Sequence, residues 1–391
     1  MARRVIFLIT DLDLGGCPLL LLRLVRDMKA RGRFAPLVAS IKSAGPVGRG
    51  ICAAGVDVVS LHAAGPWDFT AFNRWIGLLH SQQPAAVVSL LIHANLLATA
   101  AATAAPPCPY LHTLHTLQDR PRWHWPLSGF IAGRSAGVAA PSRAILNRLT
   151  LKGYCGPCFT APNGIDVEKF LNAVPPEPSQ RPWPAGSTVV GYVGRFDPVK
   201  RLDALVRGFA RLLLSDYHRW ERLQLVLIGY GPMEGPLRKL AAELGVSSHI
   251  YFPGPTAAPE IWYKTLDVFI NPCDVEGFGL SVVEAMAAGV PVMARSGGAM
   301  DEIITHDASG WLYGPDELSG RAKGAGRGAI RLRFASPDAE ADAIARALRT
   351  LLSDAALRGR LAMGGVNRVV GRYTTAKMVL KYEEILEKII G

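Results

Sequence analysis

The sequence has few cysteines and few acidic residues for its length, and each shortage excludes a class of protein. Six cysteines in 391 residues are too few for a disulfide scaffold, which indicates a reducing compartment. Only 32 Asp and Glu oppose 43 Lys and Arg, so the formal net charge is +11. A field of that sign favours anionic partners such as phosphates, nucleotides or acidic lipids without choosing among them.

Long apolar runs are also scarce. The start of the chain resembles a signal peptide, but its apolar run Val5–Ile9 is short and is followed by Asp11 and Asp13, so we interpret it as a buried strand. Residues 85–105 are the one uncharged stretch long enough to span a membrane. Their polar residues and alanine-rich second half favour a strand followed by a helix instead. We expect no transmembrane segment.

Both halves of the chain do contain a regular alternation of short apolar runs and helical patterns. Strand, helix and strand at this spacing predict an α/β protein of two Rossmann-like domains, with doubly wound parallel sheets covered on both faces. The predicted strands are Val5–Thr10, Ala35–Ser40, Val56–Ser60, Ala86–Leu91, Pro109–Thr113, Gly137–Ala140 and Cys158–Ala161, then Thr188–Gly194, Leu223–Ile228, Ile250–Pro253, Val268–Asn271, Val290–Ala294 and Gly310–Tyr313.

A stretch with five prolines, residues 173–187, predicts an extended linker between the two halves. We therefore expect an N-terminal domain over residues 1–172, a C-terminal domain over 188–370 and a terminal helix over 371–391. Ligands of open α/β sheets bind beyond the carboxyl ends of the strands. A cleft lined by both domains is where we expect the chemistry.

Two glycine pairs follow predicted strands and could offer backbone amides to an anion. Gly15 and Gly16 follow the first strand and precede a helix, although such a pair is often only a tight turn. Gly229 and Gly231 almost complete a dinucleotide fingerprint, but the third glycine is misplaced and no suitable acidic residue follows. An NAD site is not expected, while contact of this backbone with a nucleotide stays open.

Charged residues stand in two further loops after strands. In GRFDPVK, the planar guanidinium of Arg195 and the ammonium of Lys200 could together bind a diphosphate. A solvated basic loop is an equally good interpretation of this segment. In EGFGLSVVE, the glycines lead into a helix that we expect to begin near Leu280, with free amides facing an anion. Glu284 also fits a capping box with Ser281, which would need no ligand.

The motif Cys155-Gly156-Pro157-Cys158 is typical of dithiol redox enzymes. Such a pair works at the N-terminus of a helix, but here it enters a predicted strand and then the turn PNGID, residues 162–166. We interpret PNGID as a structural marker at the end of a domain. A surface disulfide stays open, and zinc would need two more ligands that the sequence does not place nearby.

These motifs, in this order, resemble the retaining glycosyltransferases of family 4 (group 1), which have the two-domain GT-B fold. The resemblance rests on the early Gly-Gly, PNGID, GRFDPVK and the Glu-x7-Glu of EGFGLSVVEAMAAGVPV. It spans nearly the whole chain and ends with RYTTAKMVLKYEEIL, which resembles the family's C-terminal helix that crosses back to the first domain.

The resemblance implies roles for individual residues. Arg195 and Lys200 would bind the donor diphosphate, Glu276 would contact hydroxyls of the transferred sugar, and Glu284 would contact the ribose. A histidine near the donor sugar is implied as well, and His115 fits its context better than His112. The implied catalytic residues are His115, Glu276, Arg195 and Lys200, and the implied donor-binding residues are Gly15, Gly16, Gly229, Gly231, Gly277, Phe278, Gly279, Leu280 and Glu284.

The implied function is retaining transfer of a hexose-type sugar from a nucleoside-diphosphate-sugar, such as a UDP- or GDP-sugar, to a glycan, lipid-linked or small-molecule acceptor. No metal or other cofactor is implied, and no further ligand cluster supports the Asp-x-Asp at Asp11 and Asp13 as a metal site. The alternatives are a sugar-nucleotide epimerase or phosphorylase of the same fold, or a non-catalytic protein that binds sugar nucleotides or anionic surfaces.

Two segments could contact an anionic membrane. One is DRPRWHWP, residues 119–126, and the other is the helix from Leu19 with its cations Arg23, Arg26, Lys29, Arg31 and Arg33. A packed loop and a solvated helix face are the plain alternatives. We expect a cytoplasmic protein, with peripheral attachment to the inner face of the membrane left open. The basic stretch 319–334 resembles an inserted loop, and without an aromatic platform it does not predict nucleic-acid binding.

Overall fold

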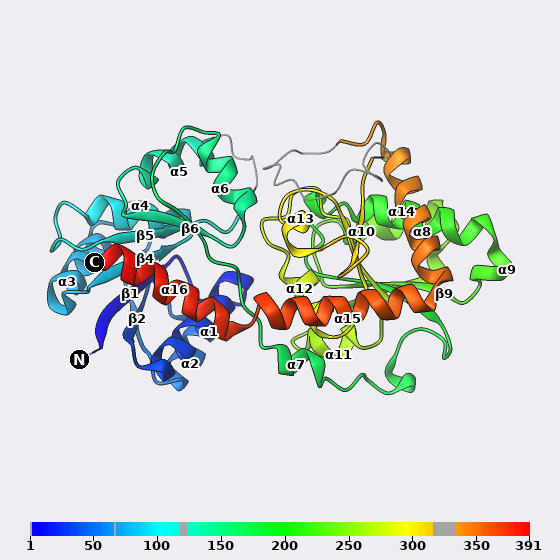
Figure 1. The fold of residues 1–391 in the computed structure, drawn as a ribbon, viewed down its shortest axis with the longest axis horizontal. Helices are drawn as coiled ribbons and strands as arrows, with labels where there is room; N and C mark the ends of the chain where they lie inside the picture. The colour runs from blue at the N-terminus through cyan, green and yellow to red at the C-terminus, as the bar shows by residue number, and fades with distance from the viewer. Residues whose placement is uncertain (1, 66–67, 118–122, 316–332) are drawn as a thin grey trace. The chain divides into compact units, whose positions relative to one another are not determined.

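The chain folds into two compact units of α/β structure (Figure 1). The computed structural model describes residues 2–65, 68–117, 123–315 and 333–391. Unit 1 consists of Met1–Ile165 and Tyr373–Gly391, and unit 2 consists of Asp166–Arg372. Residues 319–332 of the basic stretch and residues 119–122 of the loop 119–126 lie outside the described residues, so the predicted roles of these two segments stay predictions.

Unit 1 is built on a parallel sheet of seven strands in the order β3-β2-β1-β4-β5-β6-β7. The first strand lies inside the sheet, with the second on one side and the fourth on the other, so the strand order reverses there. The strands are β1 (Arg3–Ile9), β2 (Phe34–Ser40), β3 (Asp57–Ser60), β4 (Ala86–Leu90), β5 (Tyr110–Thr113), β6 (Gly137–Ala140) and β7 (Cys158–Thr160).

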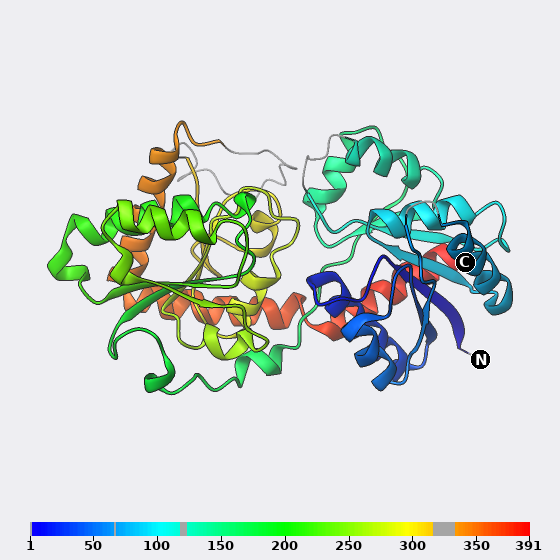
Figure 2. The ribbon, with the colours of Figure 1, turned by 180° about the vertical axis from the view of Figure 1, so that it is seen from behind.

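Helices cover both faces of this sheet. Because successive side chains of a strand point to opposite faces, Val5, Phe7 and Ile9 pack toward one helical layer and Ile6 and Leu8 toward the other. The helices are α1 (Gly16–Arg31), α2 (Gly45–Ala53), α3 (Phe69–Gln82), α4 (Ile92–Ala101), α5 (His124–Ala132), α6 (Arg143–Thr150) and α16 (Thr375–Ile390). The last of these lies in front of the sheet in Figure 1 and behind it in Figure 2.

Unit 2 has a parallel sheet of six strands in the order β10-β9-β8-β11-β12-β13. Its first strand again lies at the point where the order reverses, between β9 and β11. The strands are β8 (Thr188–Val193), β9 (Leu223–Ile228), β10 (Ile250–Gly254), β11 (Val268–Asn271), β12 (Val292–Arg295) and β13 (Trp311–Tyr313).

Helices of unit 2 pack on this sheet. They are α7 (Val167–Leu171), α8 (Leu202–Ser215), α9 (Tyr217–Trp220), α10 (Glu234–Glu243), α11 (Pro259–Tyr263), α12 (Leu280–Ala287), α13 (Met300–Ile303), α14 (Pro337–Ser353) and α15 (Ala355–Arg372). Of these, α8, α9, α10, α14 and α15 contribute to one large apolar cluster with the strands of the sheet. Short 3-10 turns occur at η1 (Pro178–Gln180), η2 (Pro198–Lys200) and η3 (Ser247–His249). The predicted fold class is confirmed, and each predicted strand has its counterpart in the sheets.

The boundary between the units lies at Ile165, earlier than the predicted proline-rich linker. Residues 173–187 belong to unit 2. Trp183 from this stretch is buried and packs on Tyr251 and Trp262, with ring centroids 6.1 Å away in both cases. The proline-rich stretch is therefore attached to unit 2 at this tryptophan.

The turn PNGID and the C-terminal helix meet inside unit 1. Ile165 pairs with Thr374, and the Gly164 amide donates to the sulfur of Met378 at 3.2 Å. A Cβ atom at Gly164 would lie 2.6 Å from the Thr374 carbonyl oxygen, so only glycine fits this approach. The contact agrees with the structural role predicted for PNGID.

The two cysteines before this turn are free and exposed. Cys158 begins β7 rather than a helix, and partial burial raises the pKa of its thiol. Neither cysteine lies at the N-terminus of a helix, where the helix dipole would lower the pKa of a thiol, so the geometry opposes the redox interpretation of CGPC.

Candidate functional site

The candidate site of unit 2 lies where the strand order of its sheet reverses. β8 has β9 on one side and β11 on the other. Open parallel sheets bind ligands outside the carboxyl ends of their strands at such a point. The loop after β8 carries Arg195 and Lys200, and the loop after β11 carries Glu276. The fold thus brings two separate sequence motifs to one edge.

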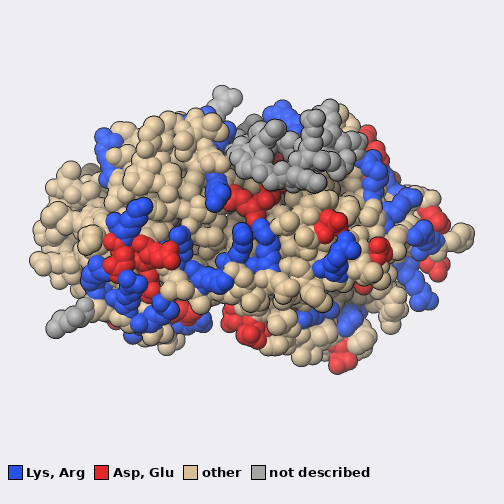
Figure 3. Space-filling model, in the orientation of Figure 1, with Lys and Arg blue, Asp and Glu red and all other residues tan. Residues whose placement is uncertain are grey.

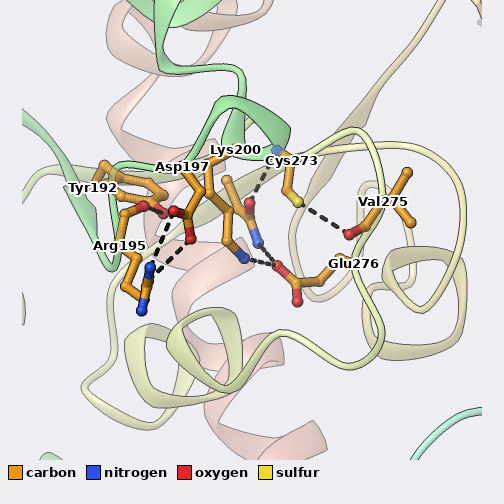
Figure 4. A network of polar contacts seen from close by, with 8 residues as sticks. Tyr192, Arg195, Asp197, Lys200, Cys273, Val275 and Glu276 are labelled. Carbon is orange, nitrogen blue, oxygen red and sulfur yellow. Dashed lines mark hydrogen bonds and ion pairs between the residues drawn. The ribbon is translucent and has the colours of Figure 1, made fainter. Parts of the chain in front are cut away.

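Lys200 and Glu276 form the central contact of this site (Figure 4). The ammonium Nζ donates to Oε2 of the carboxylate at 2.7 Å, and the side chains are 23% and 15% exposed. Burial alone would lower the pKa of Lys200, but the charge and hydrogen bond of Glu276, together with the nearby Cys273 and Tyr192, outweigh burial and hold that pKa above its ordinary value. Lys200 therefore stays positively charged at the carboxyl ends of the strands.

Arg195 stands beside this pair but is more open to solvent. Its guanidinium donates to both carboxylate oxygens of Asp197, from Nε at 3.0 Å and from a terminal nitrogen at 3.2 Å. The buried Tyr192 hydroxyl donates to the Arg195 carbonyl at 3.0 Å and fixes the backbone (Figure 4). A guanidinium has five N–H donors, and the pairing with Asp197 uses two of them, so the others could reach a phosphate.

Gly277–Leu280 form a tight turn into α12. Gly279 is the N-cap residue with φ +91°, and a Cβ there would lie 2.6 Å from the Met300 side chain and 3.3 Å from Cγ of Glu276. Glycine is therefore required at this position. The helix begins at Leu280, as predicted, and the amides of Val282 and Val283 donate to the Gly279 carbonyl at 3.0 and 3.2 Å. The amides of Leu280 and Ser281 come before the first helical hydrogen bond, so they have no acceptor within the helix.

The capping-box alternative for Ser281 and Glu284 is wrong. The cap is Gly279, and no side-chain hydrogen bond caps the helix. Glu284 instead accepts a hydrogen bond of 3.0 Å from the hydroxyl of Tyr263, which is fully buried. The carboxylate is thus held by a neighbouring helix, and a role beyond helix capping stays open to it.

Gly229 and Gly231 bring the loop after β9 against the loop after β8. At φ +141° and +157°, a Cβ would lie 1.9 Å from the Gly194 carbonyl oxygen and 2.7 Å from backbone atoms of Phe196, respectively. The Gly229 amide donates to Gly254 at 3.0 Å. That amide is used within the fold, so Gly229 supports the site through its shape.

An ion network that sequence reasoning missed lies behind this edge of the sheet. Arg295 at the end of β12 contacts Asp274 at 2.9 Å and Glu340 of α14 at 3.1 Å. Arg201, which follows Lys200, contacts the same Glu340 at 2.8 Å. The network therefore joins the loops that carry Lys200 and Glu276 to one buried carboxylate. These residues, with Arg333 and Phe334, also line a cavity of about 390 Å³.

Asn271 is a second residue that the sequence analysis did not single out. It ends β11, is buried, and places its amide nitrogen 3.5 Å from Oε2 of Glu276. Its oxygen accepts from the Cys273 amide at 3.1 Å. An asparagine directly after a buried apolar strand was the available signal.

In unit 1, Gly15 and Gly16 lie at the corresponding place, after strand β1 and at the start of α1. Gly15 has an extended backbone, and a Cβ there would meet only Pro18 at an ordinary 3.6 Å. Burial raises the pKa of the nearby Cys17 thiol to about 12, so this cysteine is not a reactive thiolate. The loop is open enough for a larger residue.

The structure separates the two candidate histidines. His112 is buried within β5, with Nδ1 2.6 Å from Ser89 Oγ and Nε2 3.0 Å from Thr99 Oγ1. His115 follows the same strand and is partly exposed, with Nε2 2.9 Å from Thr113 Oγ1. Burial lowers the pKa of both imidazoles to about 4. Only His115 is open to a ligand.

The cations of α1 are largely occupied inside unit 1. Arg31 and Arg33 bond to Glu383 and Glu387 of α16 at 3.1 and 2.9 Å, and Lys29 donates to the Gly55 carbonyl. Figure 3 shows acidic side chains over α16 with basic ones around them. This helix therefore offers few unpaired charges to a membrane.

Within the described part of the chain, no group of three or more His, Cys, Asp and Glu is arranged to hold a metal ion. Asp11 and Asp13 accordingly have no third ligand among these residues. The described helices also include none that is both long and apolar enough to cross a membrane.

Comparison with known proteins decides the family. A model described as Glycosyltransferase Family 4 matches residues 14–169, and one described as Glycosyl transferases group 1 matches residues 175–323. The chain belongs to the family 4 (group 1) glycosyltransferases. The resemblance predicted from the sequence motifs is thereby confirmed, and so is the expectation that the chain is of an enzyme family.

Curated relatives of this glycosyltransferase match only part of their own length. The D-inositol 3-phosphate glycosyltransferase of Frankia alni is 31% identical over 67% of this chain and 64% of that protein. A GDP-mannose-dependent alpha-(1-6)-phosphatidylinositol monomannoside mannosyltransferase of Mycobacterium tuberculosis is 36% identical over 38% of this chain and 40% of that one. The matches therefore span less than two thirds of these relatives.

Solved structures share the fold of this glycosyltransferase at low identity. Anabaena Alr3699/HepE, solved in complex with UDP and glucose, has a TM-score of 0.79 and 18% identity over 99% of this chain and 100% of that chain. A sucrose-phosphate synthase from Thermosynechococcus elongatus has a TM-score of 0.76 and 20% identity over 99% of both chains. The likeness confirms the GT-B fold.

Proposed function

We propose that this chain transfers a hexose-type sugar, with retention and without a metal ion, from a nucleoside-diphosphate-sugar to an acceptor hydroxyl. One observation carries the proposal. Lys200 and Glu276 meet at 2.7 Å at the point where the strand order of unit 2 reverses. A cation and a carboxylate at that edge match a donor whose diphosphate is anionic and whose sugar carries hydroxyl donors.

The chemistry follows from the charge that develops. When the bond between the sugar and the diphosphate breaks, negative charge grows on the leaving phosphate. Lys200, Arg195 and the first-turn amides of α12 would stabilise that charge without a metal. The departing phosphate oxygen would take the proton of an acceptor that attacks on the same face. Glu276 would then hold sugar hydroxyls in place and need not become a covalent nucleophile.

The comparisons support a nucleotide-sugar donor and an anionic acceptor. The relatives carry inositol phosphate or phosphatidylinositol in their names, and the Anabaena structure contains UDP and glucose. The formal net charge of +11 suits acceptors that carry phosphate. We infer that the acceptor is a hydroxyl of a phosphate-bearing small molecule or lipid.

We further infer that unit 1 contacts an anionic lipid surface through α5 rather than α1. Trp123, Phe130 and Leu151 are 54%, 60% and 69% exposed. Arg134 lies over the Phe130 ring at 3.8 Å, and Lys152 follows Leu151, so cations border the apolar side chains. Figure 3 shows a mostly uncharged surface over α5.

This contact predicts that Phe130→Asp lowers cosedimentation with phosphatidylglycerol vesicles. Phe69→Asp, on another exposed face of unit 1, serves as the control and should leave it unchanged. Equal binding by both variants would remove the α5 contact from the account.

The function is tested by proton NMR of donor turnover. UDP-, GDP- and ADP-sugars are incubated with the protein and myo-inositol 1-phosphate or a phosphatidylinositol micelle, once with EDTA and once with added magnesium. We expect one donor to give a glycosylated product whose anomeric configuration equals that of the donor. Inverted product would overturn retention, and turnover only with added magnesium would overturn metal independence. Formation of a new sugar-nucleotide without an acceptor would indicate an epimerase. Turnover that depends on inorganic phosphate would indicate a phosphorylase, and binding of the donor without turnover would indicate a binding protein.

A further inference from the structure

Thr113 sits between a backbone carbonyl and the candidate histidine of unit 1. Its Oγ1 is 3.1 Å from the Ser89 carbonyl oxygen and 2.9 Å from Nε2 of His115. Thr113 and Ser89 are both fully buried. Water therefore cannot replace either contact. Each contact is a hydrogen bond only if one of its two atoms carries a proton that points to the other.

One proton on the hydroxyl must serve the partner that can only accept. A carbonyl oxygen has no proton to give, so the contact with Ser89 is a hydrogen bond only if Thr113 donates. The same hydroxyl then has lone pairs but no proton left for His115. The contact with His115 is a hydrogen bond only if Nε2 of the imidazole carries a proton and donates it. The reverse arrangement would leave the Ser89 contact unmade.

We propose that Thr113 is a positioning residue that fixes His115 in the Nε2–H tautomer and leaves its Nδ1 as a hydrogen-bond acceptor. In a neutral imidazole one nitrogen donates and the other accepts, so a donating Nε2 makes Nδ1 an acceptor. Among the described residues, Nδ1 of His115 has no hydrogen-bond partner. Burial of the ring, which lowers its pKa to about 4, keeps the imidazole neutral at physiological pH.

The consequence for the reaction rests on the proposed function. A neutral Nδ1 acceptor can receive a hydrogen bond from a hydroxyl of the transferred sugar, and it cannot protonate the leaving group or pair with a phosphate as a cation. His115 then distinguishes donors that have a hydroxyl at that place from those that lack it. A site built to bond a hydroxyl discriminates strongly against an analogue without one.

The tautomer is tested directly by nitrogen-15 NMR of histidine-labelled protein without ligand, assigned with His115→Asn. We expect a protonated Nε2 and an unprotonated Nδ1 in the wild type, and a slowly exchanging Nε2 proton that is lost in Thr113→Val and returns in Thr113→Ser. The matched control is Thr99→Val, which removes the corresponding hydroxyl from Nε2 of His112 and should alter only the His112 signals. A proton on Nδ1 of His115 in the wild type would overturn the proposal.

A kinetic measurement separates positioning from a loss of structure. We expect Thr113→Val to raise the KM for the sugar-nucleotide about tenfold with little change in kcat, because an interaction present in ground and transition states alike has been weakened. The Kd of the nucleoside diphosphate, which has no sugar, should stay within twofold. Equal losses for both ligands would overturn the positioning role. If the wild type turns over no donor at all, the proposed function fails, and the NMR result still decides the tautomer.

Discussion

At the scale of the residue, the site depends on how one carboxylate divides its hydrogen bonds. Glu276 accepts from Lys200 through Oε2, and Asn271 lies near the same oxygen. Under the proposed function, a donor diphosphate would compete with Glu276 for the lysine, while sugar hydroxyls would need the carboxylate as their acceptor. Removal of the carboxylate charge would therefore affect binding of the nucleotide part and of the sugar part in opposite directions.

Glu276→Gln tests this division. We expect kcat/KM for the sugar-nucleotide to fall about a hundredfold, or about 2.7 kcal/mol, because the charged acceptor for the sugar is lost. The nucleoside diphosphate should bind as tightly as before or more tightly, because Lys200 has lost its internal partner. Isothermal titration with both ligands provides the measurement.

Glu284→Gln is the matched comparison, since Glu284 lies on α12, the helix that follows the same loop, and accepts a hydrogen bond from Tyr263 of α11. If Glu284 contacts the ribose, Glu284→Gln should weaken binding of the sugar-nucleotide and of the nucleoside diphosphate alike. The division would be contradicted if Glu276→Gln weakened binding of the nucleoside diphosphate as strongly as binding of the sugar-nucleotide.

The lowered pKa values of two histidines make stability depend on pH. His112 and His115 have pKa values near 4 in the folded protein, against an ordinary value of 6.5. Between these values the unfolded chain binds more protons, so the free energy of unfolding must fall as the pH drops from 6.5 toward 4. By linkage each histidine accounts for up to about 3 kcal/mol at the lower end. Urea unfolding of wild type and His112→Gln between pH 7 and pH 5 should show a smaller decrease for the variant. Parallel curves would place the His112 pKa near its ordinary value.

At the scale of the element, glycines decide how closely the loops of unit 2 approach. Gly229 and Gly231 let the turn after β9 lie against Gly194 and Phe196, which sets the position of the loop that carries Arg195. The loop after β11 depends in the same way on Gly279, which lies near Cγ of Glu276. Close contacts between uncharged backbone atoms thus set the positions of the charged side chains of the site.

Gly229→Ala should lower the stability of unit 2 by roughly 3 kcal/mol or more, because the new methyl would overlap the Gly194 carbonyl and the backbone angle is unfavourable for alanine. Gly235→Ala is the control, since it lies in α10 with no atom near its Cβ position. There alanine should add about 0.5–1 kcal/mol. The two urea midpoints give the comparison, and a tolerated Gly229→Ala would show that the loop does not need this contact.

The sequence predicted the strands well because both sheets are parallel and buried on both faces. Such strands read as uninterrupted apolar runs, and β6, β9 and β11 have the predicted bounds. Arg195, Lys200 and Glu276 could be singled out as candidates because each stands in a short motif after a strand, and the structure pairs Lys200 with Glu276.

The missed features depend on contacts between distant segments. Glu340 is buried between Arg201 and Arg295, and nothing in the sequence around it indicates this pairing. The capping-box alternative for Glu284 failed for a related reason, since the neighbours Met300 and Glu276 select a glycine as the cap. Local patterns do not contain these neighbours.

At the scale of the whole molecule, chain order and structural order differ. Helix α16 comes after unit 2 in the sequence but completes the core of unit 1, where Met378, Tyr382 and Leu386 are buried. Its buried Glu383 pairs with Arg31. The family resemblance predicted that the last helix returns to the first domain, whereas the strand pattern alone gave no such indication.

The central claim is that unit 2 binds a nucleoside diphosphate through Lys200, and the most direct test is the melting temperature of the protein with UDP, GDP and ADP, each with EDTA and with magnesium. A ligand at about 100 times its Kd adds about 2.7 kcal/mol to the stability of the folded state. We predict that one nucleotide raises the melting temperature equally with and without magnesium, that Lys200→Ala abolishes this shift, and that the exposed control Lys239→Ala retains it. No shift with any nucleotide, or an undiminished shift in Lys200→Ala, would contradict the account.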